Sequence, residues 1–104
     1  MDRIEKLKAF LSDSPGDSFL QHALALEYIK TGDDTEARVL FEKILDKDPA
    51  YVGSYYHLAK LLERQGDIPA AIGIYESGMQ QARKAGDNHA FNELMMAKED
   101  IEEM

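Results

Sequence analysis

"KTGDDTEA", residues 30–37, recurs in outline as "RQGDIPAA", residues 64–71, at a distance of 34 residues. Each stretch runs from a basic residue through a polar residue and Gly-Asp to small residues. The same shift aligns Pro15 with Pro49, and further pairs support it. These pairs are Leu24 with Leu58, Ala25 with Ala59, Ala37 with Ala71, Phe41 with Tyr75 and Glu42 with Glu76. A fixed period of this length is typical of repeat proteins, so we expect the two stretches to be equivalent joints.

Each period predicts two helices. Residues 34–47 carry apolar side chains at the i, i+3, i+4, i+7 and i+8 positions that form one helix face. Residues 18–30 carry apolar side chains at four-residue intervals. The quoted stretch lies between these two segments. We therefore expect it to join two antiparallel helices.

The predicted helix boundaries depend on glycine and on small polar residues. Gly32 supplies the left-handed residue that ends one helix, and Asp33 is expected to cap the next. Asp67 is expected to do the same in the second period. Ser18 and Gln21 have the spacing of a capping box at the start of residues 18–30.

The chain of 104 residues has the size of a single domain. We expect six helices in four successive parts. These are an N-terminal half repeat at 2–13, repeat one at 17–48, repeat two at 51–85 and a capping helix at 87–103.

Composition excludes several classes of function. The net charge is −8, with 20 acidic and 12 basic residues. Such a surface disfavours nucleic acid and anionic membranes, because both need basic residues to neutralise phosphate. No segment approaches the ~20 apolar residues of a membrane span, and the start lacks the apolar stretch of a signal peptide. There are no cysteines. We therefore expect a soluble, cytoplasmic protein.

No residue set predicts catalysis. The sequence shows neither a phosphate-binding glycine motif nor a nucleophile–base pair. None of the histidines, His22, His57 and His89, lies at helical spacing from another. A metal shared by the first two is an alternative to surface histidines, which is the interpretation that we prefer. The acidic clusters are expected to be helix caps and a solvated face. The prediction is a protein that is not an enzyme and has no cofactor and no metal.

With its period and these residues, the chain resembles the tetratricopeptide repeat (TPR) family. The matching residues are Leu24, Ala25, Tyr28, Gly32, Ala37, Phe41 and Pro49, and then Tyr55, Leu58, Ala59, Leu62, Gly66, Ala71, Tyr75 and Gly78. The resemblance covers residues 15–82 and implies an all-α, right-handed superhelical stack of antiparallel helical hairpins. Three residues depart from the family pattern. Gln21 stands where the family prefers a bulky aromatic residue, Ile44 stands where a small residue is usual, and Arg83 replaces the closing proline.

The resemblance also implies where a partner binds. In this family the first helix of each repeat, helix A, lines a concave groove that holds peptides or extended protein segments. The face of helix A opposite its hairpin partner comprises Phe19, His22, Leu26, Ile29, Lys30, Tyr56, Lys60, Glu63 and Arg64. Family members that bind chaperone tails clamp a carboxylate with lysine and asparagine. His22, Leu26 and His57 stand at the matching positions, so this clamp is absent. The mixture of apolar and basic residues suits an amphipathic segment with some acidic residues.

Three interpretations of the apolar residues Phe19, Leu26 and Ile29 stay open. In the first interpretation, the N-terminal helix covers these residues through Ile4, Leu7 and Phe10. They form a homodimer contact in the second. In the third, which we prefer, they bind a partner protein. The predicted function is accordingly a non-catalytic protein–protein interaction module, with homo-oligomerisation through the same face as the alternative. An enzyme would need a pocket with strongly perturbed titratable groups.

Overall fold

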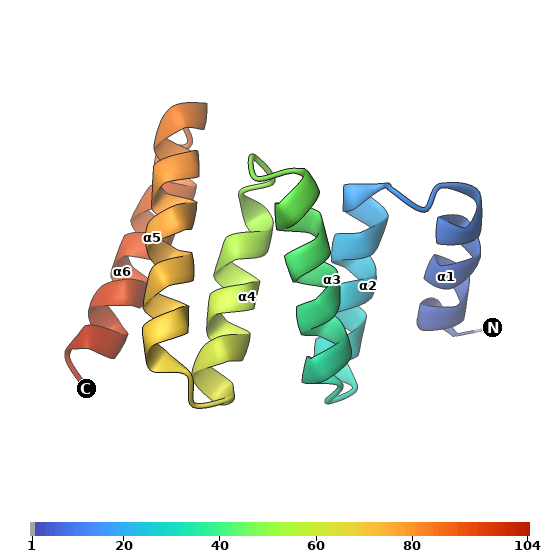
Figure 1. Cartoon of the computed structure of the whole chain (residues 1–104), viewed down its shortest axis with the longest axis horizontal. Coiled ribbons are helices and arrows are strands. Elements are labelled where there is room, and N and C mark those ends of the chain that lie inside the picture. The colour runs from blue at the N-terminus through green and yellow to red at the C-terminus, as the bar shows by residue number, and fades with distance from the viewer. Residues whose placement is uncertain (1) are drawn as a thin grey trace. The chain divides into compact units, whose positions relative to one another are not determined.

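The computed structural model describes residues 2–104, and within this range it contains six α-helices and no strand. The helices are α1 (Arg3–Asp13), α2 (Ser18–Lys30), α3 (Asp34–Lys47), α4 (Gly53–Arg64), α5 (Ile68–Ala85) and α6 (Asn88–Glu102). Figure 1 shows α2 with α3, and α4 with α5, as two helical hairpins. The predicted all-α architecture is confirmed. The helices form two compact units, the first ending at Asp48 and the second beginning at Pro49.

The two quoted stretches form the same joint. Gly32 and Gly66 both have a φ of +83°, in the left-handed region. In each turn the next residue donates its N–H to the carbonyl of the helix residue five positions earlier, at 2.8 Å for Asp33 and 3.0 Å for Asp67. This is the bond that closes a Schellman motif at a helix C-terminus. The repeated stretch is thus a helix end joined directly to a helix start, as predicted.

Aspartates begin the following helices. The carboxylates of Asp67 and Asp87 accept hydrogen bonds from the backbone N–H three residues on, at 3.2 and 3.0 Å. Each bond satisfies one of the N–H groups that a helix N-terminus leaves unpaired. Asp33 occupies the cap position of α3, but its carboxylate accepts a hydrogen bond from the hydroxyl of Thr31 at 3.0 Å.

The predicted capping box at the start of α2 is wrong. Asp17 is the cap, and its Oδ1 accepts the N–H of Leu20 at 3.0 Å. Ser18 is already the first helical residue. Gln21 does not reach back to the cap, because its side chain is buried and its Nε2 donates to the carbonyl of Pro15 at 2.9 Å.

This buried glutamine explains one departure from the family pattern. In the second repeat the hydroxyl of Tyr55 donates to the carbonyl of Pro49 at 2.6 Å. Both donor and acceptor lie 34 residues beyond Gln21 and Pro15. Two different side chains therefore make the same anchor between a helix A and the loop that precedes it.

The core of the first unit lies between α2 and α3. Its buried apolar residues are Leu24, Ala25, Ala37, Phe41 and Ile44, with Leu7 of α1. Ile44 has no exposed surface, although the family pattern prefers a small residue there. Contacts at the side of α2 hold α1: the Nε of Arg3 lies 3.5 Å from the Oε2 of Glu27, and the Nζ of Lys8 lies 5.9 Å from the ring centre of Tyr28.

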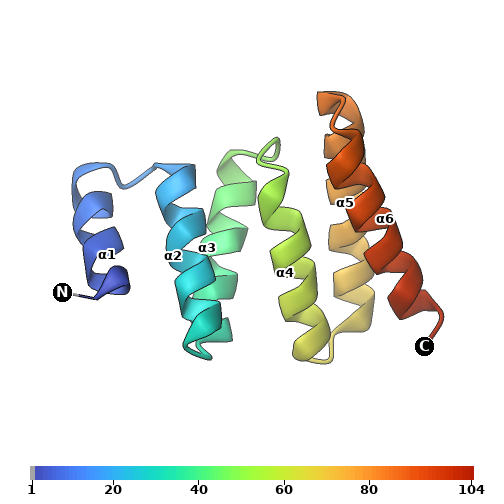
Figure 2. The same cartoon turned by 180° about the vertical axis from the view of Figure 1, so that it is seen from behind.

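The core of the second unit lies between α4, α5 and α6. Its buried apolar residues are Tyr55, Leu58, Ala59, Leu61, Leu62, Ala71, Tyr75, Ala82, Leu94, Ala97 and Ile101. Figure 2 shows α6 lying along α5 in this unit. Gly78 lies where α4 and α5 approach closely, because a Cβ atom at this position would lie 2.6 Å from the Cβ of Tyr55. Within residues 2–104, no helix combines the length and apolar character needed to cross a membrane.

Candidate functional site

The predicted face of α2 is partly open. The side chain of Phe19 is 69% exposed, and Phe10 of α1 is itself 60% exposed. Leu26 and Ile29 are half-buried. The expectation that α1 covers the whole apolar set is therefore wrong for Phe19. The physical reason is that α1 packs against α2 on the side that carries Glu27, as the ion pair with Arg3 shows.

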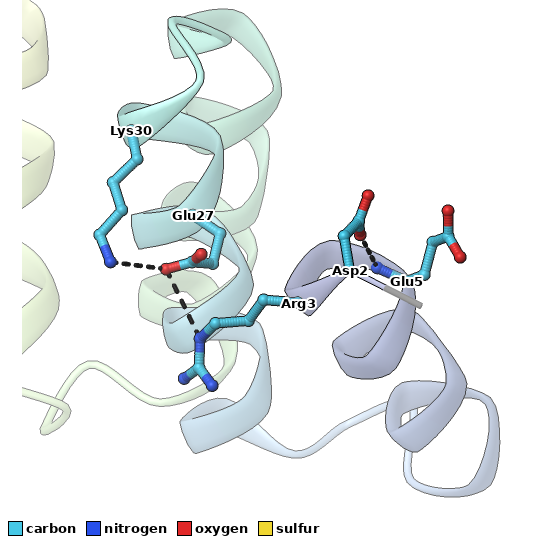
Figure 3. Close-up of polar contacts among 5 residues, drawn as sticks. All are labelled: Asp2, Arg3, Glu5, Glu27 and Lys30. Carbon is cyan, nitrogen blue, oxygen red and sulfur yellow. Dashed lines mark hydrogen bonds and ion pairs between the residues drawn. The ribbon is translucent and has the colours of Figure 1, made fainter.

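The polar members of the α2 face are engaged by neighbours within the first unit. The Nζ of Lys30 lies 3.0 Å from the Oε2 of Glu27, which also pairs with Arg3 (Figure 3). The ring of His22 is half-buried and meets the ring of Phe41 edge to face, with 5.7 Å between ring centres. The α2 face is consequently more apolar, and less basic, than its sequence suggests.

The predicted face of α4 borders a hollow. Tyr56 and Lys60 line it from α4, and residues of α6 complete the wall across a volume of about 210 Å³. The α6 residues are Glu93, Met96, Ala97 and Asp100. The Nζ of Lys60 lies 5.7 Å from the ring centre of Tyr56. An aromatic ring, a thioether and three charged groups thus face one space, all within the second unit.

Glu63 links this face to the core. Its Oε2 lies 3.6 Å from the Nζ of Lys60 and accepts a hydrogen bond from the hydroxyl of Tyr75. Burial raises the pKa of the Tyr75 phenol well above its ordinary value, and the hydrogen bond to Glu63 raises it further. Tyr75 therefore stays protonated as the donor to Glu63, and Glu63 has a structural part at the edge of the predicted face.

His57 and Arg64 lie beside the same face. Burial lowers the pKa of His57 from its ordinary 6.5, Glu93 opposes the shift and Arg64 adds to it. His57 is therefore neutral at neutral pH. Arg64 is exposed at the C-terminal end of α4.

Sequence reasoning missed the α6 side of the hollow. Glu93, Met96 and Asp100 each precede a buried residue of the stripe formed by Leu94, Ala97 and Ile101. Asp100 belongs to the acidic run at 98–103 that the sequence predicts to be a solvated face, whereas Glu93 and Met96 have no predicted role. The available signal was Met96, an apolar residue that does not belong to the stripe of Leu94, Ala97 and Ile101.

The two faces expose aromatic, aliphatic and charged side chains. Among residues 2–104, no group of three or more His, Cys, Asp or Glu side chains is placed to hold a metal ion. Burial is the main cause of the displaced pKa values of His57 and Tyr75. Exposed aromatic and aliphatic groups with charges at the rim are typical of protein-binding surfaces.

Comparisons with known proteins agree with this architecture. The sequence model of the tetratricopeptide repeat family matches residues 28–95. A TPR repeat-containing protein of Synechococcus elongatus is 35% identical over an alignment of 81 residues that covers 74% of this chain and 20% of that protein. The chain therefore spans about a fifth of the length of this curated relative.

Solved structures resemble the chain over most of its length. The crystal structure of a tetratricopeptide repeat domain protein from Salinibacter ruber is 41% identical with a TM-score of 0.82, covering 85% of this chain and 98% of that one. The solution structure of a protein from Bordetella parapertussis is 27% identical with a TM-score of 0.86, covering 99% of this chain and 90% of that one. These similarities confirm the predicted TPR-like solenoid. TPR domains generally bind proteins or peptides, and proteins built from them are generally non-catalytic scaffolds.

Proposed function

Because this chain belongs to the tetratricopeptide repeat family, we propose that it is a non-catalytic module that binds a peptide or protein segment through its A helices, α2 and α4. The proposed contact residues are those predicted from sequence: Phe19, His22, Leu26, Ile29, Lys30, Tyr56, Lys60, Glu63 and Arg64. A single domain over residues 1–104 and a cytoplasmic location stay predictions.

The exposed ring of Phe19 is the observation that carries the proposal. It is 69% exposed on α2, and packing within the first unit leaves it in solvent. Burying a phenylalanine side chain against a partner stabilises a complex by roughly 1.5–3 kcal/mol. Aromatic anchors of this kind dominate the energetics of many protein interfaces. Phe19 is thus suited to be a central contact of the α2 face.

The α4 face supports the proposal with a different chemistry. Tyr56 is half-buried, so its ring is held in place while one side meets the hollow. A ring held in this way loses little conformational freedom on binding, which favours affinity. Lys30 and Glu63 have partners within the chain. We therefore expect them to contribute less to binding than Phe19 and Tyr56.

Direct binding measurements test the proposal. Peptides are selected from a random 12-residue phage library, and their Kd values are measured for the wild type and for Phe19→Ala and Tyr56→Ala. We expect each substitution to weaken binding by about tenfold or more, as for interface anchors. Val39→Ala is the matched control, because Val39 is 52% exposed on α3, outside the proposed face. Equal Kd values for all four proteins would contradict the assigned face.

Homo-oligomerisation through the same apolar face is the second candidate, and it is favoured by the same exposed ring. The net charge of −8 works against it, because two copies repel each other. Mass in solution, measured over a range of concentrations, separates the two functions. A dimer that Leu26→Asp or Phe19→Ala converts to a monomer would favour this alternative, whereas a monomer at every concentration would exclude it.

A further inference from the structure

The side chains that line the hollow between α4 and α6 indicate which kind of side chain a bound segment places there. Its lining includes the ring of Tyr56, the side chain of Met96 and the carboxylates of Glu93 and Asp100. We infer that this hollow receives a lysine or arginine side chain of the bound segment. The inference rests on the proposed function and names the chemistry of the partner at one position.

The size of the hollow suits a single long side chain. Its volume is about 210 Å³, whereas roughly 10–15 Å³ on the same measure is enough for one water molecule. A helix, with a diameter of about 10–12 Å, is too wide to enter a space of this size. An extended segment lying on the face of α4 can direct one side chain into it.

The charges around the hollow are unbalanced in favour of the acids. Lys60 is the basic residue of the lining, and its Nζ lies 3.6 Å from the Oε2 of Glu63. The Lys60–Glu63 pair has no net charge, so the negative charges of Glu93 and Asp100 are not balanced by Lys60. Neither of these two forms an ion pair within the described part of the chain, residues 2–104.

The two neighbours with displaced pKa values, His57 and Tyr75, carry no charge that neutralises these acids. His57 is close enough to Glu93 for its pKa to respond, but burial outweighs that effect and keeps the imidazole neutral at neutral pH. Tyr75 is likewise neutral, because burial and its hydrogen bond to Glu63 raise its pKa. A cation that enters the hollow therefore meets two carboxylates that form no ion pair within residues 2–104.

The apolar part of the lining suits the stem of the same side chain. Met96 is 61% exposed, and a thioether adapts its shape to the group that it contacts. Lysine and arginine carry an aliphatic stem that packs on apolar surface while the charged end reaches polar groups. The ring of Tyr56 adds a face on which a cation is stabilised. The negative charge of the whole chain, −8, also attracts a basic segment.

This chemistry differs from the acidic segment that the sequence predicts. That prediction counted Lys30, Lys60 and Arg64 as available cations. Glu27 and Glu63 neutralise the two lysines at 3.0 and 3.6 Å, and Arg64 does not line the hollow. Glu93 and Asp100 of α6 then set the sign of the charge that the hollow presents.

A peptide selection with matched variants tests the inference. A random 12-residue phage library is selected against the wild type, against Glu93→Lys/Asp100→Lys and against Glu99→Lys. Glu99 is the control, since it is an exposed acid of α6 that does not line the hollow. We expect lysine and arginine to be enriched with the wild type and with Glu99→Lys, and the enrichment to be lost with the double variant.

One selected peptide then gives the magnitude. Its key lysine is replaced by norleucine, which keeps the stem and removes the charge. We expect Asp100→Lys to weaken the lysine peptide by about tenfold and the norleucine peptide by less than about threefold, as for a close charge pair. Equal losses for both peptides would overturn the inference.

The outcomes separate the inference from the function on which it rests. Selected peptides that bind through Tyr56 but are not enriched in lysine and arginine, or are enriched in acidic residues, would overturn the inference and leave the proposed function standing. A selection that yields no peptide, or only peptides unaffected by both Phe19→Ala and Tyr56→Ala, would overturn the proposed function and the inference together.

Discussion

Replacing Gly78 with alanine is expected to destabilise the second unit, whereas the same change at Gly73 is expected to stabilise it. Both residues lie on α5. A Cβ atom at Gly78 would lie 2.6 Å from the Cβ and 2.9 Å from the Cγ of Tyr55, and 3.0 Å from the Cδ1 of Leu94. A Cβ atom at Gly73 would have no such neighbour within 4 Å.

The magnitudes follow from two opposing effects. Alanine gains roughly 0.5–1 kcal/mol over glycine in a helix interior, because glycine loses more freedom on folding. Gly73→Ala should show this gain alone. Gly78→Ala should lose about 1–3 kcal/mol to overpacking, toward the upper end because the nearest atom is a Cβ, which moves only with its helix. Both variants share the helix gain, so we expect Gly73→Ala to exceed Gly78→Ala in stability by the overpacking loss, about 3 kcal/mol, or on the order of 15 °C in Tm.

Urea unfolding followed by circular dichroism at 222 nm measures the difference between these two variants and the wild type. The expected order of midpoints is Gly73→Ala, wild type, Gly78→Ala. A variant Gly78→Ala as stable as Gly73→Ala would refute the close approach of α4 and α5 on which the packing account rests.

Three further predictions concern single residues. Burial lowers the pKa of His57 in the folded state, so the unfolded chain binds a proton at His57 first as pH falls through about 6.5. The wild type therefore loses stability on acidification, and His57→Gln should remove this loss. Urea midpoints at neutral and mildly acidic pH check this, and identical slopes against pH for both proteins would contradict it. Tyr75→Phe should lower the free energy of unfolding by about 1–3 kcal/mol, because the carboxylate of Glu63 loses a buried donor; an unchanged urea midpoint would count against this bond. Gly66→Ala should destabilise by roughly 1–2 kcal/mol, since φ at this position is +83°, and Gly66→Asn should cost less because asparagine tolerates this region better.

The parts of the fold set by local interactions could be predicted from sequence. The turns at Gly32 and Gly66 were predictable because a left-handed glycine and the aspartate after it act within a few residues. The cap of α2 was misplaced by one residue, since Asp17 and Ser18 are both good caps. The inward turn of Gln21 could not be predicted, because it depends on the position of the Pro15 carbonyl across a loop.

The candidate site was predictable on one side only. The period placed Phe19 and Tyr56 on the A helices, where the structure has them. The contribution of α6 depended on which side of that helix stands next to α4, and a single helix pattern does not tell a solvated face from the wall of a hollow. The pairs that neutralise Lys30 and Lys60 were visible in principle, because their partners lie three residues away on the same helix.

The most direct test of the account maps a selected peptide onto the protein by amide chemical shifts in two-dimensional NMR spectra. The account predicts that the largest changes fall on α2 around Phe19 and Leu26, and on α4 and α6 around Tyr56 and Met96. Amides around Val39 on α3 should be unaffected. Changes confined to α3 and to the face of α5 away from α4 would contradict the claim that the A helices bind the partner.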